Sequence, residues 1–89
     1  MRICWRRVVG DSMLPTLKQD AIVIGVSKKT YKVGDIVIVK ISRREVIKRV
    51  YAIADDTYDI RGDNTIASTD SRSYGYIGVN QIHAKVIMA

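Results

Sequence analysis

Short segments with the pattern of β-strands recur along the chain and constrain its fold more than any other feature. They are separated by turn residues, are mostly rich in isoleucine and valine, and span residues 21–26, 36–41, 46–53, 58–61 and 82–88. Branching at Cβ favours strands over helices. No segment has the long 3.6-residue periodicity of a substantial helix, and at most Pro15 begins a single helical turn. The sequence therefore predicts an all-β fold, either a small, partly open β-barrel or a coiled antiparallel sheet.

The chain has 89 residues, a length that suits one domain. A chain of this size buries only roughly 60–65% of its extended surface, so we expect any site to be an open groove. No apolar run approaches the roughly 20 residues that span a bilayer, and the N-terminus lacks the apolar stretch of an export signal. We therefore expect residues 1–89 to form one domain without a transmembrane anchor, located in the cytoplasm or at the periphery of the cytoplasmic membrane.

The charge balance is basic, with 15 Lys and Arg against 9 Asp and Glu and a net charge of +6. These cations are scattered among acidic residues, and the aromatic residues do not cluster, so the pattern does not favour nucleic-acid binding. Trp5 among N-terminal cations is compatible with docking at an anionic membrane surface. Cys4 is the only cysteine, which excludes a disulfide framework and a multi-cysteine metal site. We expect no metal and no cofactor.

Two irregular stretches, residues 10–17 and 62–75, interrupt the strand pattern, and long loops on a small scaffold often carry function. In the first stretch Ser12 follows Gly10, and Pro15 disfavours helix at the residue before it. Such a bent segment can present a hydroxyl together with backbone N–H groups, which an acyl-transfer oxyanion needs. A serine that only caps the turn fits the same pattern, so the motif alone does not establish a nucleophile.

A serine nucleophile needs a base, and Lys48 and His83 are the candidates. His83 lies in the last strand segment with no orienting carboxylate in the pattern. Strand alternation places Lys48 on one face with Val46 and Val50, so that face is apolar except for the lysine. Burial there would disfavour the charged amine and lower its pKa, which suits a general base. A lysine at a strand edge that extends to water fits the same pattern.

Four motifs occur in a fixed order: GDSMLPTL at residues 10–17, VGDIVIV at 33–39, KRV at 48–50, and GDN followed by S-x-DSR-x-YG at 62–75. Together they resemble the Ser/Lys peptidases of the type I signal peptidase and LexA-like group. The resemblance is strongest to the minimal nickel-type superoxide dismutase maturation proteases. It implies the β-rich catalytic core of that group and a serine endopeptidase activity.

The resemblance also assigns catalytic roles by position. Ser12 corresponds to the nucleophile, Lys48 to the general base, and Ser68 to the serine that hydrogen-bonds and orients the lysine. The backbone N–H of Ser12 corresponds to one oxyanion donor. Many bacterial signal peptidases of this group have a hydroxyl residue two positions before the nucleophile as a second oxyanion donor, whereas this chain has Gly10. The resemblance to the LexA-like branch implies that a backbone amide supplies the second donor here.

Further positions correspond to supporting residues of the group. Asp70 and Arg72 match an ion pair that shapes the active-site loop, Asp63 supports the same loop, and Met13 corresponds to the substrate pocket. The expected partner is an extended peptide segment of a protein substrate with small side chains before the cut.

The resemblance implies removal of N-terminal leader, signal or propeptides from partner proteins. The chain has no room for the inserted second domain of many signal peptidases or for the helix-turn-helix of LexA-like proteins. Two alternatives remain open: a signal peptidase core without its membrane anchor, and an inactive basic β-barrel that acts as a binding module.

Overall fold

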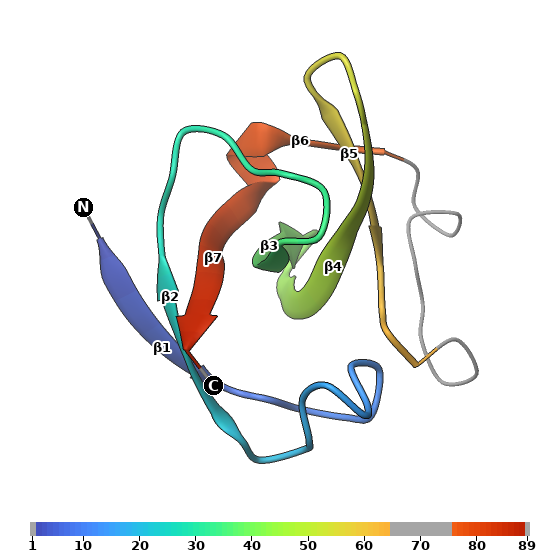
Figure 1. Cartoon of the computed structure of the whole chain (residues 1–89). Helices are drawn as coiled ribbons and strands as arrows, with labels where there is room; N and C mark the ends of the chain where they lie inside the picture. Colours follow the sequence, from blue (N-terminus) through green and yellow to red (C-terminus); the bar gives the residue numbers. More distant parts are fainter. Residues whose placement is uncertain (1, 65–75, 89) are drawn as a thin grey trace.

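The computed structural model describes residues 2–64 and 76–88, which form an all-β fold, as the sequence predicts (Figure 1). One short 3₁₀ helix, η1 (Val79–Gln81), lies in the described part of the chain. No helix in these residues is long and apolar enough to cross a membrane. The strands are β1 (Ile3–Arg7), β2 (Ile22–Val26), β3 (Ile36–Ile41), β4 (Arg44–Ala54), β5 (Thr57–Arg61), β6 (Ile77–Gly78) and β7 (Ile82–Met88).

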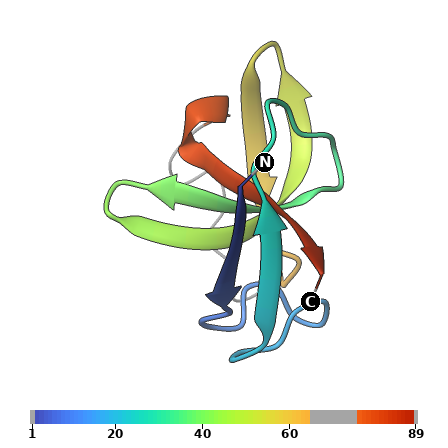
Figure 2. The same cartoon turned by 90° about the vertical axis from the view of Figure 1, so that its left-hand side faces the viewer.

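The strands form a single antiparallel sheet in the order β1-β2-β7-β3-β4-β5-β6. In this order β7, the last strand of the chain, lies between β2 and β3, and the β4–β5 hairpin lies on the far side of β3 (Figures 1 and 2). β1 and β6 are the two edges, so the sheet does not close. The gap in the sheet therefore lies between β1 and β6, the first and last strands in this order.

The structure corrects some of the predicted boundaries. The sequence pattern missed β1 because its outward residues Ile3 and Trp5 are exposed at a sheet edge, so no continuous apolar run marks it. It also placed all of residues 42–45 in a turn. In the structure the turn consists of Ser42 and Arg43 alone, because Ile41 already pairs with Arg44 across the hairpin. Ser42 adopts a positive φ of 55° in this turn.

The segment around Pro15 forms turns and contains no helix. The peptide bond before Pro15 is cis, and the N–H of Leu17 donates a 2.8 Å hydrogen bond to the carbonyl of Met13. Pro15 therefore lies inside a tight loop, not at the first position of a helix.

The buried apolar residues form two clusters. The cluster beneath the turn after β1 anchors that turn; its buried members are Val8, Met13, Leu17 and Val23. Burying a side chain as large as Met13 or Leu17 contributes about 1.5–3 kcal/mol, so this short loop is held by its own core contacts. The larger cluster comprises Tyr31, Val37, Val39, Val50, Tyr58, Ile60, Ile77 and Ile82.

Candidate active site

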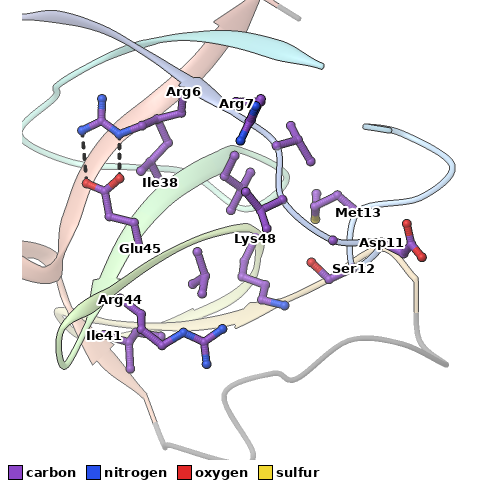
Figure 3. A pocket seen from close by; sticks show the side chains of 15 residues that line it. Arg6, Arg7, Asp11, Ser12, Met13, Ile38, Ile41, Arg44, Glu45 and Lys48 are labelled. Atoms are coloured by element: carbon purple, nitrogen blue, oxygen red, sulfur yellow. Dashed lines mark hydrogen bonds and ion pairs between the residues drawn. The ribbon is translucent and has the colours of Figure 1, made fainter. Parts of the chain in front are cut away.

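A pocket of about 560 Å³ lies between the end of β1 with its following turn and the β3–β4 hairpin (Figure 3). Its lining combines apolar side chains with charged ones, and the charged Lys48 lies near its centre (Figure 3). The lining residues are Arg6, Arg7, Val8, Val9, Gly10, Asp11, Ser12, Met13, Ile38, Ile41, Arg44, Glu45, Val46, Ile47 and Lys48. The pocket therefore brings Ser12 and Lys48, which are distant in sequence, to one site.

Lys48 extends into the pocket from β4 and is only 4% exposed. β4 lies between β3 and β5, so Lys48 is not on an edge strand. It pairs with Val37 across the sheet and shares its face with Val46 and Val50, as the alternation predicts. Figure 3 shows the amino end of Lys48 and the hydroxyl of Ser12 turned toward one another from opposite sides of the pocket. A buried amine facing a hydroxyl is the arrangement that a Ser/Lys dyad requires.

The turn that carries Ser12 has a defined backbone geometry. Gly10 has a φ of +83°, a conformation that glycine adopts without strain and other residues rarely do. The N–H of Leu14 donates to the carbonyl of Asp11 at 3.1 Å, and Met13 is buried beneath the turn. Within residues 2–64 and 76–88, the backbone N–H groups of Gly10 and Ser12 donate no hydrogen bond. Both are thus available to a ligand in the pocket.

Asn64 ties this turn to the segment that follows β5. Its backbone N–H donates to the carbonyl of Ser12 at 2.8 Å, and its side-chain Nδ2 donates to the carbonyl of Asp11 at 3.0 Å. Two carbonyls of the turn are therefore held by one residue.

Asp63 links the same turn to β4. Its carboxylate accepts two hydrogen bonds from the Arg49 guanidinium, each of 2.8 Å, and one of 2.5 Å from the Thr16 hydroxyl. Arg49 also donates to the carbonyl of Gly34 at 2.8 Å. The hydrogen bonds from Arg49, and to a lesser extent that from Thr16, lower the pKa of Asp63, whereas partial burial opposes the shift. Because Arg49 follows Lys48 directly on β4, Asp63 connects the loop of the candidate nucleophile to the strand of the candidate base.

An ion pair stands at the other end of the pocket. Arg6 of β1 donates to both carboxylate oxygens of Glu45 on β4, at 2.6 and 3.1 Å (Figure 3). These hydrogen bonds hold the pKa of Glu45 below its usual range. The pair joins the two walls of the pocket away from Ser12.

The other candidate residues predicted from the sequence do not all lie at the site. Met13 lines the pocket but is only 1% exposed, so most of its side chain belongs to the core. His83 is exposed on β7 and lines a separate small pocket beside Cys4. Ser68, Asp70 and Arg72 lie outside the described residues.

Three residues that support the Ser12 turn received no role from the sequence: Thr16, Arg49 and Asn64. Each lies within a motif that supports the resemblance, and that was the only signal that pointed to them. Among residues 2–64 and 76–88, no group of three or more His, Cys, Asp or Glu side chains is arranged to hold a metal ion.

Comparison with known proteins agrees with the fold and with the motifs. A family model described as Peptidase S24-like matches residues 2–87, nearly the whole chain. No curated protein matches the sequence.

Proposed function

Because the chain belongs to the Peptidase S24-like family of serine peptidases, we propose that it cleaves peptides with Ser12 as nucleophile and Lys48 as general base. The observation that carries the proposal is the convergence of these two side chains, from the turn after β1 and from β4, in one open pocket. Burial of Lys48 supports the role of base, because a low-dielectric environment disfavours the ammonium and favours the neutral amine.

In the proposed reaction, neutral Lys48 takes the proton from Ser12 Oγ while the oxygen attacks the scissile carbonyl. The backbone N–H groups of Ser12 and Gly10 stabilise the resulting oxyanion. Lys48 then returns the proton to the leaving amine, and an acyl ester on Ser12 remains. Next, Lys48 removes a proton from water as the water attacks the ester. Lys48 then gives this proton to Ser12 Oγ as the ester C–O bond breaks, so the acid product leaves and both residues are restored.

The loop contacts support the positioning that such a reaction needs. Asn64 and Asp63 both hydrogen-bond to the Ser12 turn, and Asp63 also binds Arg49 on β4. Errors of about 1 Å in such positions can cost about 100-fold in rate. In the proposal Ser68 orients the Lys48 amine, and Asp70 with Arg72 supports the loop, as the family resemblance implies.

The proposed substrate is an extended N-terminal leader, signal or propeptide of a partner protein. An open pocket with apolar walls supports this choice, because an extended segment can lie along it and place small apolar side chains against the walls.

The test uses a library of peptides derived from a bacterial proteome and reads every new terminus by mass spectrometry. The wild-type protein is expected to cut a defined subset, and Ser12→Ala and Lys48→Ala are expected to cut none. Ser27→Ala and Lys40→Ala are matched controls outside the pocket and should retain the wild-type pattern. Cleavage by purified Ser12→Ala with the wild-type pattern would refute the dyad.

A second candidate function is that of a signal-peptidase-type core acting at an anionic membrane surface, peripheral to the cytoplasmic membrane. Its support is the outer face of β1, where Ile3 is 69% and Trp5 is 63% exposed beside Arg7. Tryptophan and arginine together favour the interface of an anionic bilayer. Co-sedimentation with vesicles containing phosphatidylglycerol, lost in Trp5→Ala and absent with phosphatidylcholine alone, would support this candidate. Equal sedimentation of both proteins would contradict it.

A further inference from the structure

The strand that carries Lys48 also carries a second cation toward the pocket. Arg44, Val46 and Lys48 alternate along β4, and all three line the pocket. Figure 3 shows Arg44 on the same side of the pocket as Lys48 but farther from Ser12. Arg44 is exposed, so its guanidinium is accessible to a ligand that enters the pocket.

The other charges of the pocket do not neutralise Arg44. Glu45 is engaged by Arg6 through two hydrogen bonds. Asp11 lies at the opposite end, and its carboxylate points away from the pocket (Figure 3). Arg44 itself has no carboxylate partner within residues 2–64 and 76–88.

Arg7 adds a further positive charge to the lining. It lies 3.7 Å from Asp20 in a solvent-exposed ion pair, a contact that contributes little energy and leaves the Arg7 side chain accessible. The pocket therefore combines apolar walls with more cationic than anionic side chains in its lining. Arg44, which has no carboxylate partner among the residues that the structure describes, lies at the β3–β4 hairpin.

We propose that Arg44 is a specificity-determining residue that selects peptide substrates with an acidic side chain on one side of the cleavage site. The inference rests on the proposed peptidase function and names its substrate class more closely. Lys48 follows Arg44 by four positions along β4, which places their Cα atoms about 13 Å apart at the rise of a strand. An arginine side chain spans part of that length. An extended peptide would thus meet Arg44 with a side chain roughly two to four residues from the scissile bond.

The test starts from one peptide that the wild-type protein cleaves and moves a single Asp through the four positions on each side of the cut, with Ala as reference. At one position, two to four residues from the cut, Asp should raise kcat/KM about two- to fivefold, the range for an exposed ion pair. The gain should lie mainly in KM, because the contact is equal in ground and transition states. It should shrink in 0.5 M salt, as screening requires.

Arg44→Glu should reverse the preference, so that Lys at that position is cleaved faster than Asp. Arg43→Glu is the matched control, because it makes the same change of net charge at an exposed neighbour outside the pocket. It should keep the preference for Asp. Thermal melting of both variants shows whether they fold.

Cleavage without any preference for Asp, or a preference that is the same in Arg44→Glu and the wild type, would overturn the inference while leaving the peptidase proposal intact. Equal loss of the preference in Arg43→Glu would also overturn it, because the effect would then follow net charge. If the wild-type protein cleaves no peptide of the library, the proposed function fails, and this inference fails with it.

Discussion

The backbone N–H of Asn64 donates a 2.8 Å hydrogen bond to the carbonyl oxygen of Ser12, so the segment after β5 holds the turn after β1. The Asn64 side chain adds a bond to the carbonyl of Asp11. The backbone of a short turn is thereby held by a residue distant in sequence, on the side of the pocket that faces Lys48 (Figure 3).

Replacing Asn64 should impair catalysis more than folding. Asn64→Ala loses the bond to Asp11 but keeps the backbone bond to Ser12. We expect kcat for a cleaved peptide to fall about 10- to 100-fold, because a small displacement of the nucleophile is costly. Asn80→Ala, at an exposed position on η1, is the control. An unchanged kcat in Asn64→Ala would show that the side-chain bond does not position Ser12.

The Asp63–Arg49 contact should make part of the stability pH-dependent. Hydrogen bonds from Arg49 lower the pKa of folded Asp63, so its contribution is fully present above the ordinary pKa of an aspartate, about 4, and is lost as the pH falls through the lower folded value. Asp63→Asn should be less stable than the wild type by about 1–2 kcal/mol at pH 7. The difference should shrink as the pH falls below about 4.

Urea unfolding of both proteins between pH 7 and pH 2.5 measures this difference. Asp56→Asn, in the exposed turn between β4 and β5, should match the wild type throughout. A difference between Asp63→Asn and the wild type that stays constant with pH would exclude the carboxylate as its source.

Gly10→Ala should lower both stability and activity. A Cβ at Gly10 meets no atom within 4 Å, so the cost arises from its φ of +83° alone. We expect the free energy of unfolding to fall by about 1–2 kcal/mol and the melting temperature to fall by several degrees. Gly34→Ala has a comparable φ of +96° and open surroundings outside the pocket lining, so it should lose similar stability. At a temperature where both are folded, only Gly10→Ala should lose kcat.

Lys48→Arg tests whether the base must lose its proton. Arginine stays protonated at every accessible pH, so this variant should be inactive from pH 6 to pH 10, whereas wild-type activity should rise with pH. Lys48→Met is a neutral variant of similar length that should also be inactive, and circular dichroism shows whether each is folded. Residual activity in folded Lys48→Arg that follows the wild-type pH profile would rule out Lys48 as the base.

The sequence predicted the features that depend on local pattern. Alternation along residues 46–53 correctly placed Lys48 on a face with Val46 and Val50, and the strand-rich pattern correctly predicted an all-β fold. It failed at β1, an edge strand whose outward apolar residues are exposed. It also failed at the tight turn of Ser42 and Arg43, where a two-residue connection replaces the longer loop expected.

The contacts that hold the site could not be predicted from pattern. The bonds of Asn64 to the Ser12 turn and of Asp63 to Thr16 and Arg49 join segments that meet only in the folded chain. The Gly-Asp-Asn motif at residues 62–64 indicated that this segment belongs to the site, but it did not predict the hydrogen-bond partners of Asp63 and Asn64. The pairing of Arg6 with Glu45 likewise depends on β1, which the sequence did not reveal.

The central claim is tested most directly by peptide mapping of the protein quenched in acid while it turns over a cleavable peptide. We predict an acyl group with the mass of the N-terminal product on Ser12 in the wild type and none in Lys48→Ala. An acyl group on a different residue, or equal labelling of Ser12 in the two proteins, would contradict the assignment of Ser12 and Lys48 as a catalytic dyad.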